Sequence, residues 1–407
     1  MPFSKLGLHA DLLRAIKTLG WATPTPIQLQ AIPVAMKKID VLGCAQTGSG
    51  KTAAFVLPIL NKLLERPSQY GLRAVVIVPT RELAYQVESV FRDCGKFTQL
   101  KVVVVIGGVG YYGQRKAISQ GAQILVATPG RLLDHLKQGT FRLDKVEHLV
   151  LDEADRMLDM GFLPDIRSIL QRVPRERQTM LFSATLDPKV EQIAAFALRS
   201  PQRIEISSPK STAEGISQIV YPVGQPQKTD FLIAILKAIQ MRSVLVFCRT
   251  RHGVDRLVNR LAQMGFAVGV LHAARTQNQR TAAMDSFRKG KTQILVATDI
   301  AARGIDVRNI SHVINYDVPR HPEDYVHRVG RTARAYSVGD AITLVDPMEQ
   351  VFVAAIERFV GVVFPRAMLP DFPYAYPPQL ESPKTRPVGQ RRRGRHFARS
   401  YKDLFHR

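Results

Sequence analysis

Short runs of β-branched and other apolar residues recur through residues 40–346, and longer segments with helix-like spacing separate them. This alternation is typical of βα units stacked around a parallel sheet. An apolar run at residues 41–44 predicts a first strand. Further strands are expected at residues 73–79, 101–106, 122–127, 148–151 and 178–182, then at 243–248, 267–271, 292–297, 311–316 and 340–345.

The pattern stops at SSPKSTAEGISQ, residues 207–218, and then restarts. A chain of 407 residues is also too long for one ordinary hydrophobic core. We therefore predict an N-terminal domain at residues 1–207, a linker at 208–218 and a C-terminal domain at 219–364. The predicted fold class is α/β, with a mainly parallel sheet flanked by helices in each domain.

One internal repeat suggests that the two domains are related. The six residues QILVAT occur at 123–128 and again at 293–298. Two buried strands drawing on the same small set of apolar residues would be the alternative explanation. Each copy, however, ends in a Thr at the carboxyl end of a predicted strand, where doubly wound sheets place ligand contacts.

Residues 365–407 form a Pro/aromatic segment followed by a basic tail. Residues 384–407 contain nine Lys or Arg and one Asp, without apolar periodicity that could build a core. We expect this tail to be disordered when free. Its aromatic residues Phe397, Tyr401 and Phe405 among arginines suit phosphate contacts and base stacking, although a merely solubilising role is the alternative.

The formal net charge is +23, and +15 remains when the basic tail is set aside. Such an excess favours a polyanionic partner. A membrane surface is the weaker interpretation, because no basic amphipathic helix with a lipid-facing stripe is evident. Three scattered cysteines support neither a disulfide framework nor a zinc site. No secretory signal or membrane-spanning run is present, so a cytoplasmic location is expected.

VLGCAQTGSGKT, residues 41–52, combines a strand, a glycine-rich turn and the start of a helix. In a P-loop, the backbone N–H groups of such a turn surround phosphates, and a Lys neutralises their charge. Gly48, Ser49, Gly50 and Lys51 fit this pattern. Ala45 replaces the first Gly of the strict pattern, and a tight βα connection would be the purely structural alternative.

HLVLDEAD, residues 148–155, places carboxylates at the end of another strand. Asp152 would hold the water shell of a Mg²⁺ ion, with the hydroxyl of Thr52 as a second ligand. Glu153 would orient and deprotonate the attacking water. An acidic helix N-cap is the alternative for this run alone.

HRVGRTAR, residues 327–334, supplies Arg328, Arg331 and Arg334, whose guanidinium groups suit a γ-phosphate. These arginines belong to the predicted second domain. A complete site for phosphoryl transfer therefore requires the two domains to close on each other.

The order of these motifs resembles that of the DEAD-box RNA helicases of helicase superfamily 2, and the resemblance covers residues 3–346. It implies two tandem RecA-like domains, ATP and Mg²⁺ as cofactors, and RNA as the partner. The short flanks are most similar to bacterial members of the RhlE type.

The resemblance assigns roles around ATP. GWATPTPIQ, residues 20–28, is similar to the Q motif and implies that Gln28 binds the adenine edge, with Phe3 stacking on the ring and Trp21 beside it. Arg331 and Arg334 are implied as arginine fingers. The implied nucleotide contacts are Gln46, Thr47, Gly48, Ser49, Gly50, Lys51, Thr52 and Asp306.

The resemblance also assigns roles around RNA. Motifs at strand ends in both domains imply backbone contacts from Arg81, Gly108, Thr128, Gly130, Arg131, Arg249, Arg275, Thr298, Asp299 and Arg303. Coupling between the domains is implied for Asp155, Ser183, Thr185 and His327. The chain departs from the family pattern at Ala273 and Ala333, where Gly is usual.

We therefore predict an ATP-dependent RNA helicase that clamps RNA and locally unwinds short duplexes or remodels RNA–protein complexes. The alternative is a nucleotide-gated RNA clamp or scaffold with little strand separation. A DNA-translocating helicase is disfavoured by the Q motif and the DEAD sequence. RNA binding by the core should be mainly sequence-independent, and the chain is expected to be a monomer, with ribosome-assembly or RNA-decay factors as possible partners.

Overall fold

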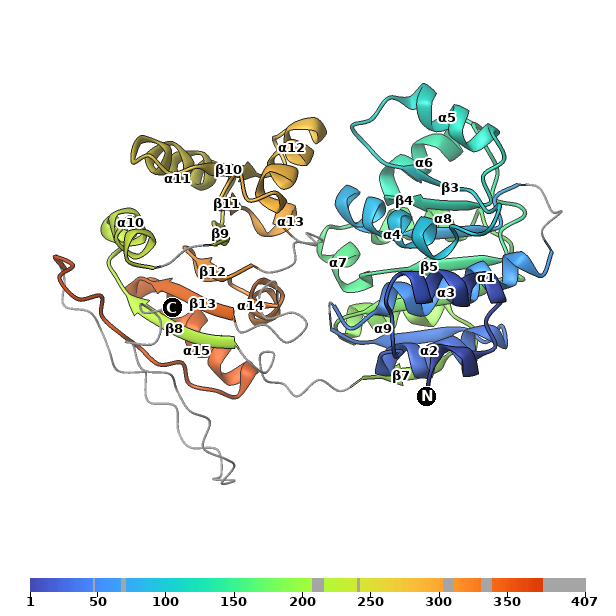
Figure 1. Ribbon diagram of the computed structural model, residues 1–407, viewed down its shortest axis with the longest axis horizontal. Coiled ribbons are helices and arrows are strands. Elements are labelled where there is room, and N and C mark those ends of the chain that lie inside the picture. The colour runs from blue at the N-terminus through green and yellow to red at the C-terminus, as the bar shows by residue number, and fades with distance from the viewer. Residues whose placement is uncertain are drawn as a thin grey trace. The chain divides into compact units, whose positions relative to one another are not determined.

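The computed structural model describes residues 1–46, 48–66, 71–206, 216–239, 242–302, 310–330 and 339–375. The chain divides into two compact units, Met1–Ser208 and Pro209–Arg407 (Figure 1).

Each unit contains one parallel sheet. The first sheet has the strand order β3-β4-β2-β5-β6-β1-β7, and the second has the order β10-β11-β9-β12-β13-β8. The strands of the first unit are β1 (Val41–Cys44), β2 (Ala74–Ile77), β3 (Val102–Val105), β4 (Ile124–Ala127), β5 (His148–Leu151), β6 (Gln178–Ser183) and β7 (Gln202–Glu205). Those of the second are β8 (Ile216–Pro222), β9 (Val244–Phe247), β10 (Val268–Leu271), β11 (Ile294–Ala297), β12 (His312–Asn315) and β13 (Gly339–Val345).

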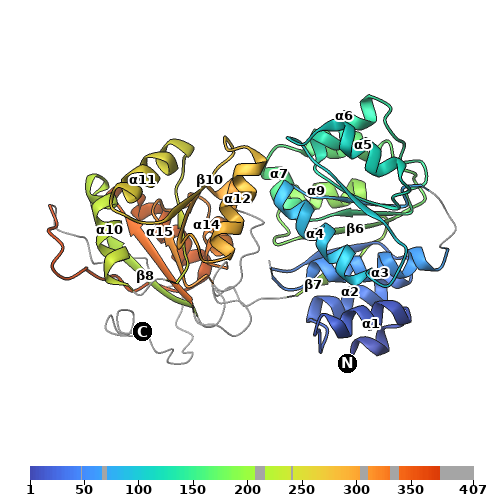
Figure 2. The same cartoon turned by 45° about the horizontal axis from the view of Figure 1, so that its top comes forward.

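Helices cover both faces of each sheet, as Figure 2 shows from a second direction. The helices of the first unit are η1 (Phe3–Leu6), α1 (Ala10–Thr18), α2 (Pro26–Met36), α3 (Lys51–Leu64), α4 (Arg81–Cys94), α5 (Tyr111–Ser119), α6 (Pro129–Lys137), α7 (Ala154–Asp159), α8 (Leu163–Leu170) and α9 (Pro188–Ala197). Those of the second are η2 (Gln225–Gln227), α10 (Lys228–Ala238), α11 (Arg251–Gln263), α12 (Gln277–Arg288), α13 (Asp299–Ala302), α14 (Pro322–Val329), η3 (Pro347–Glu349) and α15 (Gln350–Val360).

The fold class predicted from the hydrophobic pattern is confirmed. Successive residues of β4 show why the pattern is so clear: Ile124 and Val126 pack into the core on one face of the sheet, and Leu125 and Ala127 into the core on the other. A strand buried on both faces is apolar at every position, which is typical of parallel sheets.

Two strands were not predicted. β7 reads QRIE, with only Ile204 buried, because an edge strand has one neighbour and tolerates polar side chains. β8 is the edge strand of the second sheet and begins at Ile216, inside the segment predicted as linker. The predicted linker, residues 208–218, therefore extends too far.

The six-residue repeat marks the same position in both sheets. Its copies form β4 and β11. In the first sheet β4 lies between β3 and β2, and in the second sheet β11 lies between β10 and β9. The registers agree as well. His148 and Ile124 both pair with Ala74, as His312 and Ile294 both pair with Val244. The predicted relationship between the halves is confirmed.

Part of the Pro/aromatic segment packs on the second unit. Residues 364–375, here called the C-terminal strap, run along β8: Val220 donates its N–H to the Pro365 carbonyl at 2.9 Å and accepts from Ala367 at 3.0 Å. The rings of Phe372 and Tyr374 lie 4.8 and 5.8 Å from that of Phe231. The second domain was predicted to end at residue 364, so the predicted end is too early and leaves out this packed segment.

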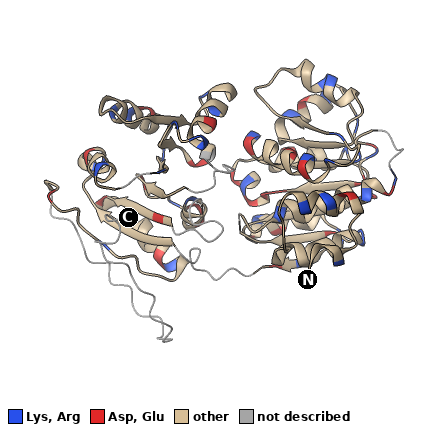
Figure 3. Ribbon diagram, in the orientation of Figure 1, with Lys and Arg blue, Asp and Glu red and all other residues tan. Residues whose placement is uncertain are grey.

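Lys and Arg lie on helices throughout both units, with Asp and Glu among them (Figure 3). Across the portion of the chain that can be described, no helix has the length and apolar character needed to span a membrane. The three cysteines are free thiols, as expected, and burial raises the pKa of Cys94 to about 12.

Two buried histidines at equivalent strand positions predict an acid-sensitive fold. Burial lowers the pKa of His148, and likewise that of His312, from 6.5 to about 4. Because the unfolded chain then binds more protons, stability should fall as pH drops from 6.5 towards 4, by about 3 kcal/mol for each ring.

His148→Gln should reduce this pH dependence for the first unit, because glutamine does not titrate. Thermal unfolding followed by circular dichroism across that pH range measures the effect. An unchanged acid slope in the variant would show that His148 does not contribute to it.

Candidate nucleotide and RNA sites

The strand order separates the predicted ATP and RNA motifs of the first unit. Of the motifs predicted for ATP, DEAD follows β5 and the P-loop follows β1, and the segment predicted for coupling, Ser183 to Thr185, lies between them at the end of β6. The motifs predicted for RNA follow β3, β4 and β2, which are also adjacent. Since all these strands are parallel, their carboxyl ends lie on one edge, with β2 and β5 at the junction.

The glycine-rich turn has the backbone geometry that its sequence predicts. Gly48 and Gly50 have φ values of 86° and 92°, in the left-handed region that favours glycine. Helix α3 begins immediately afterwards at Lys51, whose side chain is buried and donates to the Ala45 carbonyl at 2.5 Å. The turn therefore holds the Lys ammonium at a helix N-terminus, which suits phosphate.

Gln28 connects the Q motif to this turn. Its Nε2 donates to the Gly50 carbonyl at 3.1 Å, and its Oε1 accepts from the Thr25 N–H at 3.0 Å. A Cβ on Gly50 would lie 2.5 Å from that Nε2 and 2.9 Å from the Thr25 hydroxyl. Gly50 is therefore required both by its φ and by the close approach of α2.

Phe3 does not present its ring to solvent. It is only 4% exposed and packs against Trp21, with 6.4 Å between ring centroids. Its predicted stacking on adenine would require the ring to leave this packing. Trp21 is the more accessible of the two rings.

Asp152 has the environment of a cation ligand. It is 3% exposed, and burial raises its pKa to about 7, against the opposing effect of the Lys51 charge. A divalent cation would compensate for this desolvation. Nowhere in the described ranges do three or more His, Cys, Asp or Glu side chains gather as a metal cluster. A carboxylate and the Thr52 hydroxyl are ligand types that suit Mg²⁺, which characteristically shares its coordination with substrate phosphates and water.

Glu153 occupies a strained backbone conformation. Its φ and ψ are 52° and 53°, in the left-handed region that non-glycine residues rarely adopt. Its Oε2 accepts from Arg156 Nη1 at 2.9 Å in a largely buried ion pair. Arg156 lies three residues further along, in the first turn of α7, which brings its guanidinium alongside this carboxylate.

Asp155 binds the segment that follows β6. Its Oδ2 accepts from the N–H groups of Ala184 and Thr185 at 2.9 and 3.2 Å, and its own N–H donates to Ser183 Oγ at 3.3 Å. Two strand ends, β5 and β6, are therefore joined by one carboxylate. His327, the fourth residue predicted for coupling, lies in α14 of the second unit.

The RNA candidates of the first unit form two groups. Arg81 begins α4, and its guanidinium lies against the Gly107–Gly108 turn, where a Cβ on Gly108 would collide with it. Arg131 donates to the Val109 carbonyl at 3.3 Å. Thr128 is the N-cap of α6, and a Cβ on Gly130 would meet nothing within 4 Å. Crowding inside the protein therefore does not explain glycine at position 130.

In the second unit, Arg275 is held by Asp255. Its Nη2 lies 3.0 Å from Asp255 Oδ1, which also lies 3.0 Å from His272 Nε2. These contacts hold the pKa of Asp255 below its usual value, mainly through the His272 hydrogen bond. Thr298 follows β11 directly. Ala273, the departure from the family pattern, follows the buried His272.

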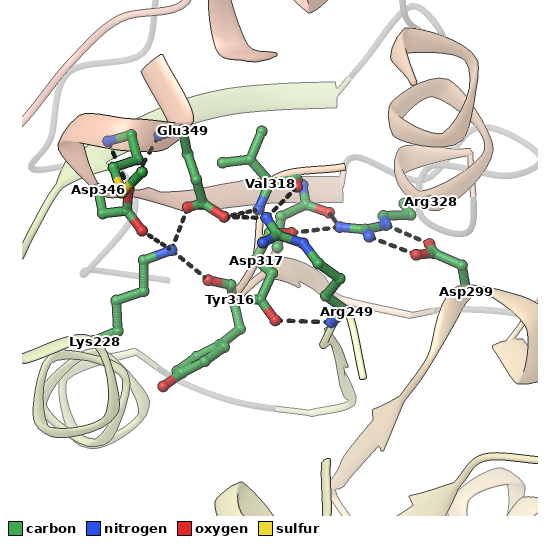
Figure 4. Close-up of polar contacts among 11 residues, drawn as sticks. Lys228, Arg249, Asp299, Tyr316, Asp317, Val318, Arg328, Asp346 and Glu349 are labelled. Atoms are coloured by element: carbon green, nitrogen blue, oxygen red, sulfur yellow. Dashed lines mark hydrogen bonds and ion pairs between the residues drawn. The ribbon is translucent and has the colours of Figure 1, made fainter. Parts of the chain in front are cut away.

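Asp299 binds an arginine rather than standing free (Figure 4). Its two carboxylate oxygens accept from Nε and Nη2 of Arg328 at 2.6 and 2.7 Å. Arg328 is 2% exposed, and its Nη1 donates to Asn315 and to the Asp317 carbonyl. Arg328 is therefore a buried arginine, and it is bound by the carboxylate of Asp299, the residue that was predicted to lie near RNA. Sequence reasoning missed the pairing because 29 residues separate the partners.

Five predicted site residues lie outside the described residues. They are Thr47, Arg303, Asp306, Arg331 and Arg334. Ala333, the departure noted between the predicted fingers, lies there as well.

The two parallel sheets in tandem, the P-loop after β1 and the acidic residues after β5 together define a nucleoside triphosphatase of the helicase class. Residues 25–193 match the DEAD/DEAH box helicase family model, and residues 227–336 match the helicase conserved C-terminal domain. The chain is 42% identical over 356 residues to the DEAD-box ATP-dependent RNA helicase CshA of Bacillus subtilis, covering 88% of this chain and 72% of that protein. It is 43% identical over 360 residues to the ATP-dependent rRNA helicase rrp3 of Schizosaccharomyces pombe, covering 88% and 77%.

Solved structures agree with these relatives. The fold matches S. cerevisiae Dbp5 bound to RNA and ADP BeF3 with a TM-score of 0.84 and 30% identity, covering 90% of this chain and 95% of that one. It matches Mss116p bound to ssRNA and AMP-PNP with a TM-score of 0.81 and 29% identity, covering 90% and 78%. The chain belongs to the DEAD-box ATP-dependent RNA helicase family.

The contact between Gln28 and Gly50 leads to a prediction about nucleotide binding. Gly50→Ala should weaken ATP affinity about tenfold or more, because the strained φ and the collision with Gln28 together displace the turn. Titration with a fluorescent ATP analogue measures this change.

Gly161→Ala is the matched control. Gly161 also has a positive φ, of 78°, but a Cβ there would meet nothing within 4 Å. It should lower stability without changing ATP affinity. Equal ATP affinities for both variants would refute the proposed role of the Gln28 contact.

Proposed function

We propose that this RNA helicase binds ATP at the ends of β5, β6 and β1 and binds RNA at the ends of β3, β4 and β2. The observation that carries this proposal is the strand order, which groups the two sets of motifs on adjacent halves of one edge. Asp155 provides a physical link within the ATP half, since it binds the residues after β6.

At the ATP half, Lys51 and the N–H groups of residues 48–52 would bind the phosphates, and Gln28 would bind the adenine. Thr52 and Asp152 would hold Mg²⁺, which supplies charge neutralisation on the phosphates when bound. Glu153 would orient and deprotonate the attacking water. Arg331 and Arg334 would stabilise the charge on the transferred phosphoryl group, so that turnover depends on both units.

At the RNA half, Arg81 and Arg131 would contact phosphates, and the open space at Gly130 would allow a close approach of the RNA backbone. Arg249, Arg275 and Thr298 would extend the contact to the second unit. Such contacts carry little base specificity, so ATPase activity should rise with added RNA and fall as salt increases.

Glu153→Gln should lower RNA-stimulated turnover at least about 100-fold and leave ATP binding intact, because the amide cannot accept the proton. A coupled ATPase assay beside a nucleotide-binding titration measures both. Glu147→Gln is the control: Glu147 precedes the same strand and pairs with buried Arg73 at 2.6 Å, so its loss should reduce stability only. Normal turnover in Glu153→Gln would remove Glu153 from this role.

Arg331→Ala should lower turnover by about 1000-fold with little loss of nucleotide affinity, as expected of an arginine that acts mainly in the transition state. The same two assays distinguish the effects. A defect confined to ATP affinity would show that Arg331 binds the ground state instead.

Strand separation is tested separately from ATP hydrolysis. A strand-displacement assay on a short RNA duplex, run beside the RNA-stimulated ATPase assay, distinguishes an unwinding enzyme from a nucleotide-gated clamp. We expect displacement that requires ATP. Stimulated hydrolysis without displacement would favour the clamp.

We further propose a cytoplasmic monomer of the bacterial RhlE type, with the basic tail as an additional RNA tether and ribosome-assembly or RNA-decay factors as protein partners. The support for the tether is the charge of residues 384–407. Comparing RNA affinity of residues 1–375 with that of the full chain tests the tether. Equal affinities would leave the tail without that role.

A further inference from the structure

A buried ion network in the second unit lies behind one of the proposed RNA contacts, Arg249 (Figure 4). At its centre lies Lys228, the first residue of α10, which is fully buried. Its ammonium binds Glu349 Oε2, donates to the Tyr316 carbonyl at 3.0 Å and lies 3.7 Å from Asp346 Oδ2. Three separate segments of the unit therefore meet at one cation.

The second oxygen of Glu349 binds an arginine at the surface. Oε1 accepts from Arg249 Nη2 at 2.6 Å and from the Val318 N–H at 3.2 Å. The Glu349 side chain is 5% exposed, whereas that of Arg249 is 38% exposed. One carboxylate thus connects a buried ammonium to a guanidinium that solvent can reach.

The network fixes Glu349 firmly. Lys228 and Arg249 supply two positive charges against the two negative charges of Asp346 and Glu349, which limits the cost of burying them. Asp346 also caps the turn that contains Glu349, accepting from the N–H groups of Met348 and Glu349 at 2.8 and 3.0 Å. The carboxylate that holds Arg249 is therefore itself held by backbone and side-chain contacts.

The Arg249 guanidinium has more hydrogen-bond donors than its contacts with Glu349 and Val318 use. Its Nη2 serves Glu349 and the Val318 carbonyl, and its backbone N–H donates to Asp317 at 2.7 Å. Within the described ranges, its Nε and Nη1 have no hydrogen-bond partner. An arginine restrained in this way loses less rotamer entropy when it binds a phosphate.

We propose that Glu349 is a positioning residue for RNA binding, which holds the Arg249 guanidinium through Nη2 so that Nε and Nη1 are available for an RNA phosphate. This inference rests on the proposed RNA contact of Arg249. Arg275 shows the same arrangement, since Asp255 holds its Nη2. Arg249 and Arg275, both predicted to contact RNA, are thus each restrained by a carboxylate from a neighbouring element.

The test uses the full chain and a single-stranded oligouridine RNA. Glu349→Gln should raise the Kd measured by fluorescence anisotropy with a non-hydrolysable ATP analogue by about threefold to tenfold, because the hydrogen bond to Arg249 loses the negative charge of its acceptor. The RNA concentration for half-maximal ATPase stimulation should rise equally, while kcat at saturating RNA stays unchanged. A purely structural role would not separate these two quantities.

Glu357→Gln is the matched control. Glu357 lies on α15, is 8% exposed and pairs with Arg366 at 2.9 Å. Both variants should lower the melting temperature, but only Glu349→Gln should change the RNA concentration dependence. If Glu357→Gln changes it equally, general destabilisation is responsible and the inference is overturned.

Arg249 variants separate this inference from the proposed RNA contact. Arg249→Ala should weaken RNA binding, and adding Glu349→Gln to it should have no further effect. If Arg249→Ala leaves RNA affinity unchanged, the proposed contact itself fails. If Arg249→Ala weakens binding while Glu349→Gln leaves it unchanged or tightens it, only the positioning role fails.

Arg249→Lys keeps the test valid if Glu349→Gln does not fold. Lysine preserves the charge but lacks the guanidinium fork that serves Glu349 and a phosphate together. It should lose nearly as much RNA affinity as Arg249→Ala. Affinity close to that of the unaltered chain would show that charge alone is sufficient, and would overturn the inference.

Discussion

The common direction of the strands is the constraint on which the rest of the structure depends. Every strand pair among the described residues is parallel. A parallel strand reaches its neighbour only through a crossover, so each sheet collects the segments after its strands on one edge. Lys51 and Asp152, which are far apart in the sequence, become neighbours in this way. The Lys51 charge acts to lower the pKa of the buried Asp152 carboxyl, against the larger effect of burial.

The sequence predicted what is local. Strands buried on both faces and the turn at Gly50 follow from short motifs with a known geometry. The contact between Asp155 and the end of β6 spans 28 residues and was implied only by the family resemblance. It did not predict edge strands such as β7, whose polar residues give no signal, or the C-terminal strap, whose aromatic residues find their partner Phe231 more than a hundred residues earlier. Long-range ion pairs were missed for the same reason, because no spacing rule connects Lys228 with Glu349.

Carboxylates restrain arginines at several points of the second unit, with different consequences. Both carboxylate oxygens of Asp299 accept from Arg328, and this arginine is buried in the core of the unit. Glu349 binds only one end of Arg249, which stays partly exposed. The geometry of the pair, rather than the presence of an arginine in a motif, therefore decides whether the side chain remains available to a ligand.

The matching registers of the two sheets have a consequence for the ancestry of the chain. Lys51 begins the helix after β1 and Lys228 begins the helix after β8, and these strands occupy the same place in their sheets. If both units descend from one duplicated gene, Lys228 is the counterpart of the phosphate-binding lysine. In the second copy, the carboxylates of Asp346 and Glu349 supply the negative charge that a phosphate would bring. The ammonium at this position of the second sheet is therefore neutralised from within its own unit.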